Sequence, residues 1–128
     1  MATPQRPLSP HLGIYRWQLT MALSILHRAS GVFLSLGAVL LIVVVACIAS
    51  GPASYEFIQG WLVNPVGQLF LVAWTAALYL HMANGVRHVV WDMGIGLEKN
   101  TAIQSGLYVV VFSVIATALS WLLALGVF

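Results

Sequence analysis

Residues 29–50 read ASGVFLSLGAVLLIVVVACIAS, an apolar run of 22 residues that contains no charged side chain. A transmembrane α-helix needs about 20 mostly apolar residues to cross the hydrocarbon core of a bilayer. Two further uncharged stretches follow, at 57–86 and 100–128. We therefore predict an all-α membrane bundle with three spanning helices near 29–50, 67–86 and 106–127.

The composition of the whole chain supports a membrane protein. Of its 128 residues 61% are hydrophobic and 6% are charged, and the mean hydropathy is +0.97. A soluble domain has about 25% charged residues. Five Lys and Arg against three Asp and Glu are too few for nucleic-acid binding. Cys47 is the single cysteine, which excludes a disulfide scaffold and a self-contained iron–sulfur or zinc-finger site.

The chain is predicted to form one membrane-anchor domain over residues 1–128. An N-terminal segment, 1–19, precedes helices expected at 20–50, 64–92 and 101–128. Local signals favour these ends. Gly51-Pro52 ends the first helix, and Asn64-Pro65 supplies an N-cap and a first-turn proline to the second. Gly94 and Gly96 end the second helix, and Thr101 with Gln104 forms a capping box for the third.

The cations are distributed asymmetrically. Arg6, Arg16 and Arg28 lie before or at the start of the first span, and Arg87 and Lys99 lie between the second and third. No Lys or Arg occurs in the connection between the first two spans, and none occurs at the C-terminal end. The positive-inside rule predicts an inner N-terminus and an outer C-terminus. Because neither a secretory signal nor an Arg- and Ser-rich transit peptide is recognisable, we expect a bacterial inner membrane, with a mature chain of the mitochondrial inner membrane as the less favoured alternative to it.

His81 is the most conspicuous polar residue within a span. Six residues before Arg87, it would lie roughly 9 Å inside the hydrocarbon if Arg87 marks the surface. An ionisable side chain at such depth is usually functional. Asn84 and His88 continue a polar stripe, and Gly85 leaves space beside it. This pattern suits haem ligation, although an interhelical hydrogen bond is the alternative.

A six-coordinate haem needs a second axial ligand at a similar depth on another helix. His88 lies on the same helix, about 10 Å along its axis, and His27 should lie roughly 10 Å shallower than His81. His11 lies in the N-terminal tail. Either a partner subunit shares the haem, or His81 is not a ligand.

A second group of polar residues lies at the start of the first span. Ser24, Arg28 and Gly31 share one helix face, with His27 adjacent. A hydroxyl beside a guanidinium can bind a quinone carbonyl and stabilise the negative charge that develops on reduction. The same Arg and His could instead pair with haem propionates, or Arg28 could simply extend to lipid phosphate.

Asp92 follows these polar residues at the predicted inner surface. It would pair with Arg87 or Arg16, or it would relay protons to a reduced quinone.

Two motifs together resemble the signatures of the cytochrome b subunit of succinate dehydrogenase. The first combines residues 6–12, RPLSPHL, with residues 24–31, SILHRASG. The second is H-x-x-x-G-x-R-H-x-x-W-D over residues 81–92. With the length, the three spans and the orientation, the resemblance covers essentially the whole chain.

The resemblance implies roles for individual positions. His81 stands at the axial histidine of one haem b, whose other axial histidine comes from a second small anchor subunit. Ser24 and Arg28 stand at ubiquinone-site positions, with pocket-lining positions at Ile25 and Trp17.

The resemblance also places His27 and Arg28 near the haem propionates. It implies an iron–sulfur subunit, which delivers electrons to ubiquinone, and a flavoprotein subunit, which oxidises succinate. This chain would then be non-catalytic for succinate by itself.

Three other classes of protein are alternatives to this family. A fumarate reductase anchor would run the reverse reaction with a quinol. A non-redox small membrane transporter would use His81 for proton coupling and would contain no haem. A dihaem cytochrome is disfavoured because it needs paired histidines at matching depths.

Overall fold

The computed structural model describes residues 16–126. This part of the chain forms helices and no strand, and the helices are α1 (Leu19–Ala49), α2 (Pro52–Val63), α3 (Pro65–Asp92) and α4 (Lys99–Ala124). Three of them, α1, α3 and α4, are long and apolar enough to cross a membrane. The all-α, three-span prediction is therefore confirmed. Arg6, His11 and the last two residues of the predicted third helix lie outside the described residues.

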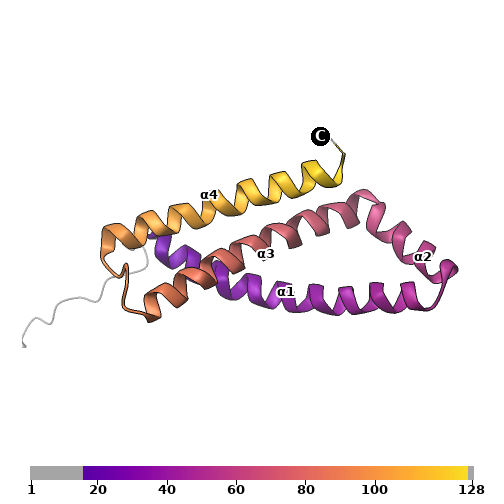
Figure 1. Cartoon of the computed structure of the whole chain (residues 1–128), viewed down its shortest axis with the longest axis horizontal. Helices are drawn as coiled ribbons and strands as arrows, with labels where there is room; N and C mark the ends of the chain where they lie inside the picture. Colours follow the sequence, from indigo (N-terminus) through magenta and orange to yellow (C-terminus); the bar gives the residue numbers. More distant parts are fainter. Residues whose placement is uncertain (1–15, 127–128) are drawn as a thin grey trace, which may run out of the picture.

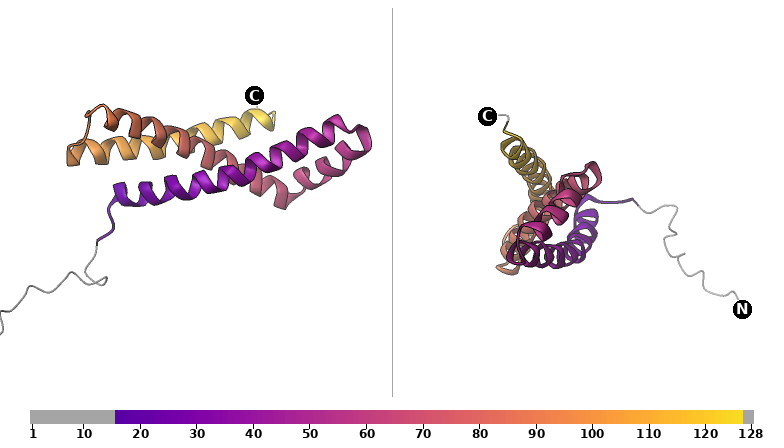
Figure 2. Two further views of the ribbon diagram at one scale, coloured as in Figure 1. Left: turned by 90° about the horizontal axis from the view of Figure 1, so that it is seen from below. Right: turned by 90° about the vertical axis from the view of Figure 1, so that its right-hand side faces the viewer.

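The three long helices lie side by side, with α3 in contact with both α1 and α4 (Figure 1). α1 contacts α4 over a shorter stretch. Successive long helices run in opposite directions, so the start of α1 and the end of α4 lie toward opposite ends of the molecule (Figures 1 and 2). This antiparallel order places the start of α1 beside the end of α3.

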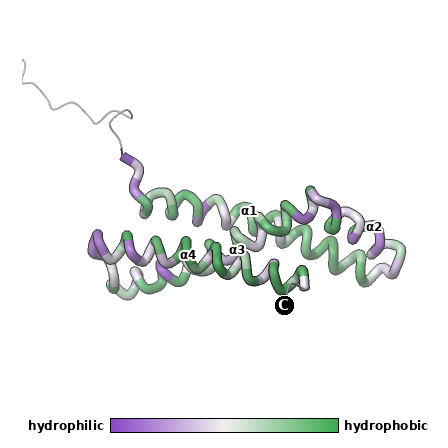
Figure 3. Tube along the Cα trace, turned by 90° about the horizontal axis from the view of Figure 1, so that it is seen from above, coloured by the Kyte–Doolittle hydropathy of each residue, from purple (hydrophilic) through white to green (hydrophobic). Residues whose placement is uncertain are grey.

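The distribution of polar and apolar residues is that of a membrane protein. Most large apolar side chains of the long helices are exposed, and apolar residues dominate the middle of each helix (Figure 3). Besides Gly37 and Gly106, the buried residues of the described chain are four apolar ones, Leu23, Ile58, Ala102 and Val109, and four polar or charged ones, Ser30, Asn84, Arg87 and Ser113. Lipid is itself apolar, so polar groups and close packing hold such helices together.

Helix α2 is absent from the sequence prediction, which treated 51–63 as a connection. Gly51 has φ 110°, a left-handed conformation that glycine adopts without strain, and Pro52 begins α2 directly after it. Twelve residues span about 18 Å, too short to cross a bilayer. A helix this short has no long apolar run, so the criterion used for the spans does not predict it.

The ends of α3 follow the predicted signals. The Asn64 side chain accepts a hydrogen bond from the Gly67 amide at 2.9 Å, which confirms the N-cap. After Asp92 the chain turns through Gly94 and Gly96, whose φ angles of 77° and 76° are left-handed.

The start of α4 differs from the sequence prediction. Its first residue is Lys99, with Glu98 as the N-cap, and the Ala102 amide already donates to the Glu98 carbonyl. The predicted capping box at Thr101 is wrong because Thr101 lies within the first helical turn.

Candidate functional site

The His81 imidazole lies on α3 and bonds to α1. Its Nδ1 is 3.1 Å from the Ser30 Oγ and 3.1 Å from the His27 carbonyl oxygen. A carbonyl oxygen can only accept a hydrogen bond, so Nδ1 carries the hydrogen. In the neutral ring Nε2 therefore holds the free lone pair. A histidine that ligates a metal is commonly oriented in this way, through its other ring nitrogen.

Ser30 and Gly31 adapt α1 to the His81 ring. The buried Ser30 hydroxyl donates to the His27 carbonyl at 2.9 Å, so it accepts from His81 Nδ1. A Cβ atom on Gly31 would lie 3.1 Å from His81 Cε1, which is a crowded contact. The sequence prediction did not assign Ser30 a role. Its signal was the spacing of three residues from His27, which places both on one helix face.

His27 lies at the level of His81. The two rings stack with centroids 4.1 Å apart and an interplanar angle of 10°. The prediction that His27 lies about 10 Å shallower is therefore wrong. That count assumed that Arg87 marks the membrane surface, whereas Arg87 is a buried residue between helices.

The third histidine of this group is His88, which meets the His27 ring edge-on at 5.1 Å. Iron binds to the nitrogen lone pair in the plane of the ring, so the stacked His27 and His81 rings cannot both point at one ion between them. Within residues 16–126 no group of three or more His, Cys, Asp or Glu side chains is arranged to hold a metal ion.

His27 has a buried ring nitrogen with unused bonding capacity. Within the described residues its Nδ1 has no hydrogen-bond partner, and such an atom is costly unless something else satisfies it. A Cβ atom on Gly85 would lie 3.8 Å from His27 Cε1. The His27 ring therefore borders the space beside Gly85 at an ordinary van der Waals distance.

A cavity of about 320 Å³ lies where the first turns of α1 meet the end of α3. Arg28 donates to the Ser24 Oγ at 3.4 Å and to the Ser24 carbonyl at 3.3 Å. Because the Ser24 hydroxyl accepts from Arg28, its own hydrogen is available to a ligand. The lining residues are Thr20, Met21, Ser24, Ile25, Arg28 and Trp91.

The structure brings three predicted site residues, Ser24, Ile25 and Arg28, to this cavity. Trp17 lies just before α1 with 69% of its surface exposed and is not among the lining residues. The lining residues that the sequence prediction did not include are Thr20, Met21 and Trp91.

Asp92 and Arg87 are not paired in the described part of the chain. Asp92 is exposed at the end of α3. Arg87 is 6% exposed and bonds to neutral groups instead, namely Asn84 Oδ1, Ser105 Oγ and the Ala102 carbonyl. The predicted pairing of Asp92 with Arg87 is therefore wrong.

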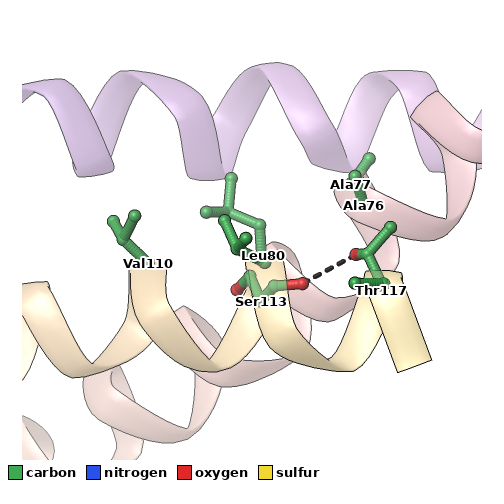
Figure 4. A pocket seen from close by; sticks show the side chains of 8 residues that line it. Ala76, Ala77, Leu80, Val110, Ser113 and Thr117 are labelled. Atoms are coloured by element: carbon green, nitrogen blue, oxygen red, sulfur yellow. Dashed lines mark hydrogen bonds between the residues drawn. The ribbon is translucent and has the colours of Figure 1, made fainter. Parts of the chain in front are cut away.

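A second hollow of about 410 Å³ lies between α3 and α4 (Figure 4). Its two hydroxyls belong to Ser113 and Thr117, and each donates to a backbone carbonyl of its own helix. The other lining residues are apolar. This hollow lacks free polar groups that would orient a ligand.

Comparison with known proteins gives consistent matches. Residues 2–120 match the family described as succinate dehydrogenase/fumarate reductase transmembrane subunit. The chain is 38% identical to the mitochondrial succinate dehydrogenase cytochrome b560 subunit of Bos taurus, over 90% of this chain and 69% of that protein. It is 36% identical to the succinate dehydrogenase cytochrome b556 subunit of Rickettsia felis, over 91% of each chain.

Proposed function

Because this chain belongs to the family of succinate dehydrogenase/fumarate reductase transmembrane subunits, we propose that it binds haem b and ubiquinone and passes electrons from an iron–sulfur subunit to the quinone. The resemblance carried by the two sequence motifs is thereby confirmed at the level of the family. Relatives named as cytochrome b subunits support the haem. The alternative of a non-redox transporter has no such support.

The described residues fit a haem at His81. Nδ1–H is held by Ser30 and the His27 carbonyl, which leaves Nε2 to ligate iron. His27 Nδ1, which has no hydrogen-bond partner within residues 16–126, and the Arg28 guanidinium one residue further would offer hydrogen bonds to propionates. Bound haem b supplies a one-electron carrier. The hydrogen bonds to Nδ1 are the observation that carries this proposal.

We assign the other axial histidine to a second small anchor subunit, so that one haem is shared between two chains. The stacking of His27 on His81 supports this assignment, because a stacked ring cannot be the opposing ligand. The remaining partners in the proposal are an iron–sulfur subunit and a flavoprotein subunit, which oxidises succinate to fumarate.

Ser24 and Arg28 are proposed to hold the quinone in the 320 Å³ cavity. The Ser24 hydroxyl donates to one quinone carbonyl, and the Arg28 guanidinium stabilises the negative charge that develops as electrons arrive. Two electrons and two protons convert the quinone to a quinol. The exposed Asp92 carboxylate is the proposed relay for those protons. Ile25, which lines the cavity, is proposed to contact the quinone ring, and Trp17, just before the start of α1, is proposed as a further contact from outside the lining set.

The proposed location is the inner membrane of a bacterium, by similarity to the Rickettsia felis protein. Relatives from mitochondria are equally members of the family.

The haem assignment is tested by a reduced-minus-oxidised visible spectrum of the detergent-purified complex, wild type against His81→Ala. We expect the variant to lose the b-type bands while succinate oxidation with an artificial dye persists. An unchanged b-type spectrum would overturn the ligand assignment.

The quinone assignment is tested by Ser24→Ala and Arg28→Leu in the same complex. Each should lower quinone reduction by roughly 10- to 100-fold, the effect of losing a hydrogen bond to a charged group. Succinate oxidation with the dye should stay at the wild-type rate. Normal quinone reduction in both variants would contradict the proposal.

A further inference from the structure

Arg87 is a buried cation whose partners are all neutral. Its Nε donates to Ser105 Oγ at 2.9 Å, one terminal nitrogen donates to the Ala102 carbonyl at 2.7 Å, and the other donates to Asn84 Oδ1 at 3.2 Å. Within residues 16–126 no carboxylate pairs with it. Burying a guanidinium is costly even when it is hydrogen-bonded, so a feature that only packs two helices would be made more simply by an apolar residue.

The same guanidinium lies over the ring of Trp91. The Arg87 carbon Cζ is 3.9 Å from the centre of the indole ring, a favourable cation–π distance. The Trp91 Nε1–H donates to the Gly96 carbonyl at 3.1 Å. The indole is therefore held on one face and at one edge, which leaves it little rotamer freedom.

Trp91 is the part of the cavity wall that α3 contributes. The other described lining residues, among them Ser24 and Arg28, come from α1. An aromatic ring opposite polar groups is a common way to hold a flat ligand, because the ring stacks while the polar groups orient it.

The hydrogen bonds of Arg87 also extend, through Asn84, to the α1 wall of the cavity. Asn84, which is 1% exposed, accepts from Arg87 and donates through Nδ2 to the Leu23 carbonyl at 3.4 Å. Leu23 directly precedes Ser24 and is itself 1% exposed. One guanidinium thus connects Trp91 on one side of the cavity with the backbone that carries Ser24 on the other.

We propose that Arg87 is a positioning residue of the quinone site, and that it holds Trp91 as an aromatic wall against which the quinone ring packs opposite Ser24 and Arg28. This inference rests on the proposed quinone function. It adds Trp91 as a contact residue and gives a role to a cation that touches neither the quinone nor the haem.

The test measures KM and kcat for a short-chain ubiquinone in the assembled, detergent-purified complex. Trp91→Leu should raise KM roughly three- to tenfold, the loss of one aromatic contact, with kcat nearly unchanged. Trp91→Phe should restore most of the affinity because it keeps a ring. Trp121→Leu, a matched change near the far end of α4, should leave KM at the wild-type value.

Arg87→Lys tests the positioning role, because lysine keeps the charge and loses the planar face and the forked donors. It should raise KM by a similar factor in the wild-type background and by almost nothing in the Trp91→Leu background. Such non-additivity identifies two residues that act through one contact. Additive effects, or a normal KM in Trp91→Leu, would overturn the proposal.

Two readouts separate failure of this inference from other failures. Haem content and succinate–dye activity report whether the complex has assembled. If Arg87→Lys does not assemble, the KM values of Trp91→Leu and Trp91→Phe decide the proposal. If Ser24→Ala and Arg28→Leu abolish quinone reduction while the Trp91 variants keep a normal KM, the quinone site stands and the inference is wrong. If Ser24→Ala and Arg28→Leu have no effect, the proposed function itself fails.

Discussion

Two serines six residues apart on α1, Ser24 and Ser30, differ in what their hydroxyls can reach. Ser30 is buried and lies between the His27 carbonyl and His81 Nδ1, where it fixes the orientation of an imidazole. Ser24 borders the cavity and accepts from Arg28, so its hydrogen stays available to a ligand. The first is expected to act on a metal ligand and the second on a substrate, although both are the same residue type.

Ser30→Ala should weaken haem retention without abolishing it. The change removes one of the two acceptors of His81 Nδ1–H and leaves the His27 carbonyl. Loss of such an orienting partner typically costs 10- to 100-fold in affinity, and with one acceptor left we expect roughly tenfold. The measurement is the haem-to-protein ratio of the purified complex during dilution.

Ser35→Ala is the matched control for this prediction, because the exposed Ser35 hydroxyl donates only to the Gly31 carbonyl of its own helix. It should retain haem as the wild type does. Equal retention in both variants would remove Ser30 from the haem site.

Among the helices, α1 and α3 approach closely where a glycine faces an indole. A Cβ atom added to Gly37 would collide with the Trp74 indole, and both residues line a small apolar cavity with Leu62 and Leu71. This contact gives Gly37 a close-packing role between α1 and α3. Without strong hydrophobic attraction between helices in lipid, such small residues determine how near two helices come.

Gly37→Ala should therefore destabilise the assembled complex by about 1–3 kcal/mol, the usual effect of overpacking. Thermal unfolding of the detergent-purified complex measures the shift. Gly60→Ala, on α2 with open space around its Cα, should be neutral or slightly stabilising because alanine favours a helix. A Gly37→Ala midpoint equal to that of Gly60→Ala would contradict the packing argument.

For the molecule as a whole, the described cations gather toward one end of the bundle. Arg16 and Arg28 are near the start of α1, and Arg87 and Lys99 flank the connection from α3 to α4. Glu56 lies on α2, toward the opposite end (Figure 1). The positive-inside rule then predicts that α2 faces the outer compartment.

That orientation is testable with single cysteines in a Cys47→Ser background. Both Glu56 and Lys99 are exposed, so Glu56→Cys and Lys99→Cys give comparable labelling sites. In intact cells an impermeant maleimide should label Glu56→Cys, and it should label Lys99→Cys only after permeabilisation. The reverse pattern would invert the topology.

Sequence and structure contributed differently to the candidate site. Ser24, Ile25 and Arg28 could be grouped from the sequence because helical periodicity relates residues within one helix. Trp91, Ser30 and Asn84 could not be assigned their contacts, since these depend on how α1 and α3 are paired and rotated. The depth of His27 relative to His81 was misjudged because Arg87, taken to mark the membrane surface, is buried between the helices.

Hydropathy and the scarcity of charge determined by themselves that the chain is an all-α membrane protein with three spans, because the bilayer imposes a length and an apolar composition on every crossing helix. Only the tertiary structure decided that Arg87 lies inside the bundle, that His27 stacks on His81, and that Trp91 and Ser24 line one cavity. The physical reason is that a span is a property of one segment, whereas these contacts arise between helices and depend on their packing.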